Sequence, residues 1–454
     1  MINHNQIITL FDYTQDECGA RFGATWGMEF PQYFVPKAEA ATFVEVPTER
    51  RSNADYYAAE EVAATRGAAG LWETAIYARY EVMGPGAAAW LDRLFASKLP
   101  AVGRVRLATM LKPDGKMQGD LTLARLAEDR FLIVGSYYLQ EWHQRWFHSQ
   151  LPSDGSVRIC NVSDELMGFS LSGPRARDIL AVLCPGQDVS NKALPFMAIT
   201  TMDVGPVSNA LVARISLTGE MGYEVTVPVT QHRALWRALM AAGEPLGMRQ
   251  IGNRALESLR HEKAYGIWSL EFTQAYSPAA CGLDRFIDFD KPYFVGREAV
   301  LRERTGAGAG AGDTSAGGQG PPQRLVQLSI DAPDADARML DPVWHRGKLV
   351  GSVTSGAYGH HVKQSLALAY IDAEIAGAAD AALTVHVVGE PRPARILLEP
   401  PYDPKVSELC RACAYSSACL PILPCYMLLY TRPYTYHRMT GMQVFSSANR
   451  PMSI

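Results

Sequence analysis

A run of glycine, alanine and serine divides this sequence of 454 residues into two unequal parts. Residues 305–322 read TGAGAGAGDTSAGGQGPP. A segment of this composition behaves as a flexible linker, because it has few side chains that could be buried in a core. The run does not fit a phosphate-binding GxGxxG loop, because that pattern from Gly306 would need glycine at position 311, where the chain has alanine. We therefore expect one folded unit on each side of the linker.

The unit before the linker alternates strand-like and helix-like segments. Tyr77–Met83 alternates like a strand, and Gly84-Pro85-Gly86 then turns into a helix that ends near Leu94. The remaining predicted strands are Val105–Leu111, Asp120–Leu126, Arg130–Val134, Phe169–Ser172, Ala210–Leu217 and Tyr223–Val227. The remaining predicted helices are Gly135–Gln150, a segment that begins after Gly173-Pro174, and residues of about 230–242 and 250–264. This order predicts an α+β fold with mixed sheets rather than a doubly wound dinucleotide-binding fold.

Six short strands separated by turn residues follow the linker. They are Leu325–Ile330, Pro342–Arg346, Lys348–Thr354, Ser365–Ile371, Leu383–Val388 and Ala394–Glu399. Such strands indicate a small β-barrel, which we place at residues 323–404. Residues 405–454 are rich in Cys, Met, Tyr and Ser with weak periodicity, so we expect an atypical, disordered tail. Its Cys410-x-x-Cys413 lacks the second CxxC pair that a zinc site needs, and we predict no metal.

The composition excludes several classes of partner. The formal net charge is −4 and no long basic run occurs, so we expect no nucleic-acid partner. Apolar stretches of about 18 residues are absent from the sequence, so we expect no transmembrane helix and no membrane partner. The segment from Met1 to Glu17 contains no Lys or Arg and resembles neither a secretory signal nor an arginine-rich transit peptide, so the sequence predicts a cytoplasmic location.

The first candidate site residue, Asp120, follows a turn. Residues 110–122 read MLKPDGKMQGDLT and place this carboxylate at the start of a predicted strand. Beside a cavity, such a carboxylate can accept a proton or stabilise a neighbouring cation, which contributes roughly 10²–10⁴ in rate. The alternative is an aspartate that faces solvent at the start of a strand.

The second candidate, Glu224, also lies just past a turn. Residues 216–224 read SLTGEMGYE and end with Tyr223 and Glu224 on a predicted strand. A single carboxylate can accept two parallel hydrogen bonds from a ring N–H and the adjacent amino group, and it can thereby bind a guanidine-like edge. The alternative is a glutamate that pairs with Lys or Arg within a hairpin.

The third candidate is Arg260, in the segment Ser258-Leu259-Arg260-His261-Glu262 at the end of a predicted helix. An arginine at this place can pair with a carboxylate of a ligand. The alternative is an ordinary i,i+3 or i,i+4 ion pair on the helix surface.

Together these segments resemble the tetrahydrofolate-dependent aminomethyltransferases, a family that includes the glycine cleavage T-protein and the folate domains of dimethylglycine and sarcosine dehydrogenases. The resemblance covers roughly residues 18–404. Further matching motifs are Gly27-Met28-Glu29-Phe30-Pro31, Ser172-Gly173-Pro174, Lys291-Pro292-Tyr293-Phe294-Val295-Gly296 and Pro401-Tyr402-Asp403-Pro404. The resemblance implies a T-protein-like cloverleaf of mixed α/β subdomains around a central cavity, followed by the C-terminal β-barrel.

The resemblance also assigns roles to the candidate residues. Tetrahydrofolate would bind in the cavity, with its pterin held by Glu224 on the strand that includes Tyr223 and Leu217, and with its reacting nitrogens near Asp120. Arg260 would face the cavity and pair with a carboxylate of the cofactor's glutamate tail. A small-molecule, amine-derived donor would deliver a one-carbon unit and give 5,10-methylenetetrahydrofolate.

Two positions depart from the family pattern. Leu217 stands where the dehydrogenase relatives usually carry an aromatic residue, and Ala280 replaces an acidic residue. These departures favour an alternative, a folate-binding module without catalysis. A related iron–sulfur assembly factor is disfavoured, because residues 291–298 lack the cysteine of that group's signature. A demethylase with a sulfonium or aryl ether donor would use the same cavity.

The resemblance further implies a flavoprotein half. No βαβ unit with GxGxxG precedes residue 18, so we expect no FAD site in this sequence. Residues 1–45 resemble the remnant of a linker from a flavoprotein-type central domain, and residues 46–304 resemble the folate-binding domain. FAD would come from a separate flavoprotein partner or a missing domain, so the sequence could also be a truncated form of an FAD-dependent dimethylglycine dehydrogenase-like oxidoreductase. By resemblance, the location would be the mitochondrial matrix.

Overall fold

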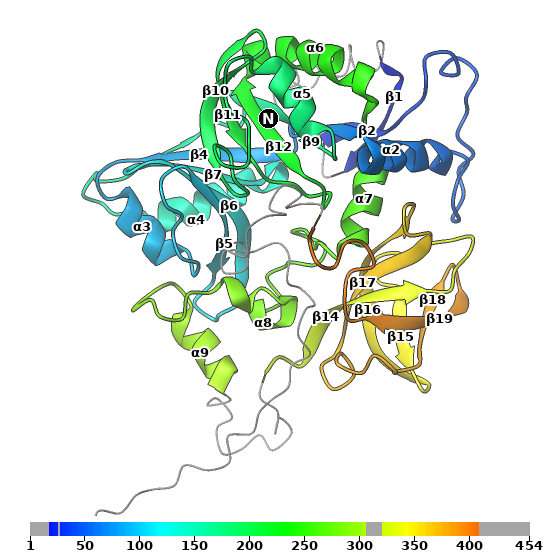
Figure 1. The fold of residues 1–454 in the computed structure, drawn as a ribbon. Helices are drawn as coiled ribbons and strands as arrows, with labels where there is room; N and C mark the ends of the chain where they lie inside the picture. The colour runs from blue at the N-terminus through cyan, green and yellow to red at the C-terminus, as the bar shows by residue number, and fades with distance from the viewer. Residues whose placement is uncertain (1–17, 26–27, 306–319, 408–454) are drawn as a thin grey trace, which may run out of the picture.

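The computed structural model describes residues 18–25, 28–305 and 320–407 of the chain (Figure 1). Its main bodies are a five-stranded sheet, a six-stranded sheet and a closed six-stranded barrel. A hairpin of β1 (Ala20–Thr25) and β2 (Met28–Phe34) precedes them. The expected α+β fold with a C-terminal β-barrel is therefore confirmed.

The five-stranded sheet is antiparallel and has the strand order β5-β6-β7-β4-β8. Its strands are β4 (Tyr77–Met83), β5 (Arg104–Leu111), β6 (Met117–Ala127), β7 (Arg130–Ser136) and β8 (Arg158–Asn161). Two helices, α3 (Ala87–Leu94) and α4 (Gln140–Gln150), cover one face, where Trp90, Leu91 and Phe147 join a buried cluster with strand residues. Side chains alternate along a strand, so every second residue points to the opposite face. That opposite face borders the cavity described below.

The six-stranded sheet has the order β10-β11-β12-β9-β3-β13, and only β13 runs parallel to its neighbour. Its strands are β3 (Ala69–Glu73), β9 (Leu166–Ser172), β10 (Ile199–Val204), β11 (Val207–Ala213), β12 (Gly222–Pro228) and β13 (Met248–Gln250). Helices α5 (Ala176–Leu183) and α6 (His232–Gly243) lie over one face (Figure 1) and bury Leu180, Leu235 and Leu239 against it.

Helices α2 (Asp55–Gly67) and α7 (Asn253–Glu262) pack against each other and against the hairpin. The Glu61 carboxylate of α2 accepts hydrogen bonds from the backbone N–H groups of Phe34 at 2.6 Å and Gly252 at 2.8 Å. This carboxylate therefore joins the end of β2 to the start of α7. The shorter helices are α8 (Pro278–Cys281) and α9 (Arg297–Thr305), with 3₁₀ turns η1 (Tyr137–Leu139), η2 (Val229–Gln231), η3 (Glu244–Leu246) and η4 (Asp284–Phe286).

The barrel closes in the order β14-β17-β16-β15-β18-β19. Its strands are β14 (Gln323–Ile330), β15 (Pro342–His345), β16 (Lys348–Gly359), β17 (Gln364–Asp372), β18 (Leu383–Val387) and β19 (Glu390–Leu397). Because β14 pairs with both β17 and β19, closure satisfies backbone groups that would otherwise form a sheet edge. The inward side chains, such as Val326, Leu328 and Val353, form one buried cluster.

One predicted strand ends earlier than expected. The segment Ala210–Leu217 is a strand only as far as Ala213. Ser216 Oγ lies 3.0 Å from Thr218 Oγ1 and accepts a hydrogen bond from the Thr218 backbone at 3.2 Å. Such local side-chain hydrogen bonds compete with the sheet ladder and turn the chain out of it. Leu217 therefore lies in a loop rather than on the strand.

Other predicted elements have shifted ends. The helix expected over Gly135–Gln150 begins only at Gln140, because β7 continues to Ser136 and η1 follows. The last barrel strand begins earlier than predicted, at Glu390. Residues 306–319 of the expected linker and 408–454 of the expected tail, including its cysteine pair, lie outside the described residues. Among the helices of the described segments, none has the length and apolar character needed to cross a membrane.

Candidate functional site

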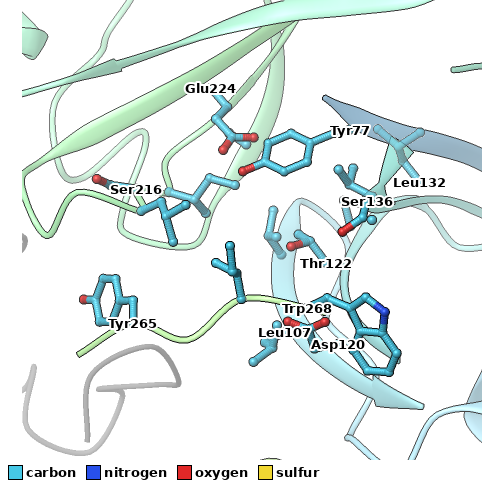
Figure 2. A pocket seen from close by; sticks show the side chains of 18 of the residues that line it. Tyr77, Leu107, Asp120, Thr122, Leu132, Ser136, Ser216, Glu224, Tyr265 and Trp268 are labelled. Atoms are coloured by element: carbon cyan, nitrogen blue, oxygen red, sulfur yellow. The ribbon is translucent and has the colours of Figure 1, made fainter. Parts of the chain in front are cut away.

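A cavity opens between the five-stranded and the six-stranded sheets (Figure 2). The space between its walls amounts to about 1290 Å³ when the solvent at its open mouth is included. Strands β4 to β7 form one wall and β10 to β12 form the facing wall, while residues 215–217, 265–268 and 283–286 line the remainder. Most lining side chains are apolar, for example Val105, Leu107 and Ile199, so a few polar groups determine its chemistry.

Asp120 enters the cavity from β6. On this strand Asp120, Thr122 and Ala124 line the cavity, whereas Leu121 and Leu123 lie in the buried cluster beneath α3 and α4. The two-residue period of a strand produces this alternation. The strand thus presents its single carboxylate to the cavity and its leucines to the core.

Enclosure changes the acid–base behaviour of Asp120. Burial raises the pKa of its carboxyl group from 3.8 to about 8, with a smaller upward contribution from the Glu271 carboxylate and a downward one from a backbone hydrogen bond. At neutral pH the group is therefore largely protonated. A positive charge placed beside it would favour the ionised form.

Glu224 enters the same cavity from β12. Glu224 and Thr226 line the cavity, and Val225 lies between them in the core beneath α5 and α6. Burial raises the pKa of Glu224 from 4.5 to about 7, and the Arg79 guanidinium limits this rise. The structure thus brings Asp120 and Glu224, which are far apart in the sequence, to one cavity from two different sheets (Figure 2).

Arg79 is the buried cation near this site. From β4, its guanidinium donates hydrogen bonds to the carbonyl groups of Thr74, Tyr77 and Leu166 and to the Thr74 hydroxyl. Burial lowers the pKa of Arg79 to about 10, and the attraction of Glu224 opposes this decrease. Arg79 therefore remains positively charged at neutral pH and stabilises the ionised form of Glu224.

Leu217 lines the cavity from the loop before β12. Its side chain packs with Ile76 and Tyr77 against a buried cluster between the helices α2 and α7. Arg66 fixes the turn that follows by donating a hydrogen bond to the Thr218 carbonyl at 2.8 Å. The wall of the cavity at position 217 is therefore apolar.

The structure corrects the expectation for Tyr223. This side chain is fully buried on the opposite face of β12, where its hydroxyl accepts a hydrogen bond from Arg177 Nε at 3.1 Å. Neighbouring residues on a strand point to opposite faces, so the tyrosine next to Glu224 has to point away from the cavity.

Arg260 is corrected in the same way. It is fully buried in the last turn of α7, where its guanidinium pairs with Glu257 at 2.6 Å and with Glu271 at 3.3 Å. Arg260 therefore holds the segment after α7 in place instead of facing the cavity. Ala280 is also buried, in an apolar cluster that includes Phe272, and does not line the cavity.

Metal ligation has no support in the part of the chain that the structure describes, because no group of three or more His, Cys, Asp or Glu side chains there could hold an ion. Asp120 and Glu224 supply the cavity with two carboxyl groups whose pKa values lie near neutral pH. Such groups can bind N–H donors, stabilise a cation and exchange a proton.

Comparison with known proteins places both parts of the chain. Residues 11–291 match the GCVT N-terminal domain, which is more than half of the sequence, and residues 323–403 match the Glycine cleavage T-protein C-terminal barrel domain. The chain belongs to the glycine cleavage T-protein family. The resemblance inferred from the motifs is confirmed.

Curated relatives in this family include enzymes of the transferase type. The chain is 30% identical over 319 residues to the aminomethyltransferase of Symbiobacterium thermophilum, covering 69% of this chain and 80% of that protein. It is 28% identical over 393 residues to mitochondrial dimethylglycine dehydrogenase of Homo sapiens, covering 86% of this chain and 43% of that protein. The chain thus spans less than half the length of that dehydrogenase.

A solved structure of the glycine cleavage T-protein family shares the fold. The aminomethyltransferase T of the glycine cleavage system from Bartonella henselae matches with a TM-score of 0.70 and 22% identity, over 85% of this chain and 95% of that chain. This likeness establishes the cloverleaf arrangement expected from the sequence.

Several cavity residues of this family member were not predicted. Tyr77 lies on the predicted strand Tyr77–Met83, two residues before the buried Arg79. Residues two apart on a strand point to the same face, so this spacing could have placed Tyr77 on the face of β4 that borders the cavity. Tyr265, Trp268 and Arg285 line the cavity from irregular segments and a 3₁₀ turn, where no periodic signal indicates which side chains face inward.

Proposed function

We propose that this chain binds tetrahydrofolate in the cavity and transfers a one-carbon unit to it from an amine-derived small molecule. One observation carries the proposal: Asp120 and Glu224 enter a single, mostly apolar cavity from two different sheets. A reduced pteridine has flat apolar faces and a nitrogen-rich edge, and apolar walls with two separate carboxyl groups suit such a molecule. Membership of the glycine cleavage T-protein family supports the same ligand.

Glu224 would bind the pterin edge. In its ionised form it accepts two parallel hydrogen bonds, one from a ring N–H and one from the adjacent amino group. Arg79 favours that ionised form. Because the cavity walls are apolar, a hydrogen bond to a charged group is stronger there than in water.

Asp120 would serve the reacting end. Tetrahydrofolate, when bound, supplies the amine nitrogens that accept the one-carbon unit. With a pKa of about 8, Asp120 holds a proton at neutral pH and can release it when a cation develops nearby. The ionised carboxylate then stabilises the positive charge of the donor. The remaining contribution of the protein is orientation of the two reactants.

A folate-binding module without transferase activity is the second candidate. The apolar wall at Leu217 favours it, because a leucine side chain offers no hydrogen bond to a substrate. The two candidates share the ligand and differ only in whether product forms.

Calorimetry with tetrahydrofolate tests the binding step. We expect the wild type to bind and Glu224→Gln to lose at least about tenfold in affinity. Asp120→Asn should keep most of the affinity and lose about 10²–10⁴ in the rate of transfer. Equal affinities of the wild type and Glu224→Gln would remove the pterin-edge assignment. Binding without transfer by the wild type, with donors generated by an amine-oxidising flavoprotein, would select the second candidate.

An amine-derived donor requires an oxidising partner. A relative at 31% identity over 54% of this chain is sarcosine oxidase subunit alpha of Corynebacterium sp. (strain P-1), whose name describes a subunit of a larger enzyme. We propose that an FAD-containing flavoprotein, as a separate protein or a further domain, supplies the donor in the mitochondrial matrix. Copurification of a flavin-containing protein and subcellular fractionation test this proposal.

A further inference from the structure

A phenol hydroxyl, that of Tyr77, lies beside Glu224 in the cavity. Tyr77, at the start of β4, lines the cavity on the wall that faces β12. Figure 2 shows its hydroxyl directed toward the Glu224 carboxyl group. Both residues also act electrostatically on the same buried guanidinium, that of Arg79. The orientation in Figure 2 and these shared interactions with Arg79 agree in placing the phenol and the carboxyl group at one end of the cavity.

Neighbouring groups hold the Tyr77 ring in place. Trp72 contacts it edge-on, with ring centroids 5.8 Å apart and an interplanar angle of 81°. Leu217 and Ile76 pack in the same cluster, and the Tyr77 backbone N–H donates a hydrogen bond to the Thr74 carbonyl at 3.2 Å. A ring fixed on a strand by such packing presents its hydroxyl in a preorganised position, which lowers the entropy cost of binding a ligand.

We propose that Tyr77 is a specificity residue, which donates a hydrogen bond to the 4-oxo group of a pterin whose adjacent N–H and amino groups bind Glu224. This inference rests on the proposed function and deepens it. One edge of a pterin presents an amino group, a ring N–H and a carbonyl oxygen in succession. An ionised carboxylate only accepts hydrogen bonds, so it satisfies the first two groups but repels the third. A phenol hydroxyl is a donor and completes the set.

The pairing predicts which ligands the cavity distinguishes. A 4-oxo pteridine satisfies both Glu224 and the Tyr77 hydroxyl. A 2,4-diamino pteridine presents an amino group where the 4-oxo group would be, so it accepts no hydrogen bond from the Tyr77 hydroxyl. Its adjacent ring nitrogen carries no hydrogen, so it also offers Glu224 one donor fewer. A site that donates a hydrogen bond to an oxygen of its ligand binds an analogue without that oxygen more weakly.

Calorimetry with two probes tests the inference. Tetrahydrofolate and its 2,4-diamino counterpart, tetrahydroaminopterin, are titrated into the wild type, Tyr77→Phe and Glu224→Gln. The control is Tyr293→Phe, the same change at a tyrosine that is 52% exposed and lies outside the cavity. We expect Tyr77→Phe to weaken tetrahydrofolate binding about tenfold and tetrahydroaminopterin binding less than about twofold. Tyr293→Phe should change neither affinity.

The outcomes separate the inference from the proposed function. If Tyr77→Phe binds tetrahydrofolate like the wild type while Glu224→Gln loses binding, the inference is wrong and the proposed function stands. Equal losses for both probes in Tyr77→Phe also overturn the inference, because they indicate a role in cavity shape alone. If neither variant loses affinity, the proposed function is wrong as well.

A second measurement needs only the wild type. Infrared spectroscopy follows the 4-oxo carbonyl band of bound tetrahydrofolate that carries a carbon isotope label at that position. We expect a band at lower wavenumber than in an aprotic solvent, because a hydrogen bond weakens the carbonyl stretch. A band at the aprotic position would show that no donor reaches the carbonyl and would overturn the inference.

Discussion

At the scale of the residue, Asp120 and Glu224 differ from surface carboxylates mainly in what surrounds them. Desolvation raises the pKa of Asp120 to about 8 and that of Glu224 to about 7. Each value lies near neutral pH, where a small change in the cavity alters the proton occupancy. A ligand with N–H donors or positive charge therefore couples its binding to proton release.

Binding of tetrahydrofolate should strengthen as the pH rises from 6 to 8. Glu224 has to be ionised to accept two hydrogen bonds, and its pKa in the free protein is about 7. Below that pH, part of the binding free energy is used to remove the proton from Glu224. The affinity should therefore decrease as the pH is lowered, and the decrease should approach about tenfold per pH unit well below pH 7. Calorimetry in buffers of different ionisation enthalpy measures both affinity and proton release. Asp120→Asn should keep the slope, and Glu224→Gln should lose it. An affinity that is independent of pH in the wild type would contradict the prediction.

The stability of Asp120→Asn relative to the wild type should increase from acid to alkaline pH. The folded chain binds the Asp120 proton more tightly than the unfolded chain, because the pKa rises from 3.8 to about 8 on folding. The stability linked to this proton is complete below about pH 4 and is lost as the pH rises toward 8. The asparagine variant has no such loss. The difference in free energy of unfolding, variant minus wild type, should therefore be at least about 1 kcal/mol larger at pH 9 than at pH 5.5. Urea unfolding at both pH values measures this difference, and an equal difference at the two would refute the assignment.

At the scale of the element, the sequence predicts strands well where alternation and turns are both clear. Tyr77–Met83 was predicted with its correct bounds, because a glycine–proline turn ends a segment that alternates over most of its length. The strands that were not predicted are β1, β2, β3, β8, β10 and β13. Four of the five residues of β3 are buried, so the alternation that marks a strand with one solvent face is missing.

For the candidate site residues, too, the sequence predicted the element but not the direction of every side chain. The motif around Glu224 indicated the correct strand, but strand parity alone does not say which face borders a cavity, so Tyr223 was assigned to the wrong side. The helix that contains Arg260 was also predicted. Its partner Glu271 lies in an irregular segment whose path depends on tertiary contacts. Sequence patterns contain no information about such contacts.

Glu271 controls the irregular segment that lines the cavity through Tyr265 and Trp268. Its carboxylate accepts hydrogen bonds from the Ile267 backbone at 2.9 Å, the Thr354 hydroxyl at 2.8 Å and the Ser355 hydroxyl. The side chain is fully buried, so water does not reach this carboxylate. The segment is thereby attached to barrel strand β16.

Glu271→Gln should loosen this wall of the cavity. The amide loses the charge that Arg260 faces and part of the acceptor capacity, so we expect the free energy of unfolding to fall by about 2–4 kcal/mol. Hydrogen exchange of backbone amides in residues 265–272 should accelerate, as measured by mass spectrometry of peptides covering them. The matched control is Glu298→Gln, whose side chain is 76% exposed and should have little effect. Unchanged exchange in residues 265–272 would show that the segment is held by other contacts.

At the scale of the whole molecule, one buried node joins the parts around the cavity. Arg66 of α2 pairs with Glu220, in the loop before β12, at 2.8 Å and with Glu262, at the end of α7, at 2.7 Å. Its guanidinium carbon lies 3.6 Å from the ring centroid of Tyr402, which follows the barrel and donates a hydrogen bond to Glu220. The Glu220 loop also carries Leu217 into the cavity. The site therefore depends on how the barrel, helices and six-stranded sheet meet.

Arg66→Gln should destabilise the protein by about 3–5 kcal/mol, because it leaves two buried carboxylates without their cation. The exposed fractions of the Glu220 and Glu262 side chains are 1% and 0%, so water cannot replace the arginine. The control is Arg50→Gln, whose partners at the surface are about half exposed and whose loss should cost less than about 1 kcal/mol. Urea unfolding measures both variants.

Pairing the substitutions tests whether the charge itself is the cause. Adding Glu220→Gln to Arg66→Gln removes one of the unpaired carboxylates, so the double variant should lose less stability than the sum of the two single losses. Raising the salt concentration should reduce the small effect of Arg50→Gln, since exposed charges are screened, and should leave that of Arg66→Gln nearly unchanged. Strictly additive losses at positions 66 and 220 would show that the node contributes through packing alone, and the cavity would then not depend on this ionic link between the barrel and the sheets.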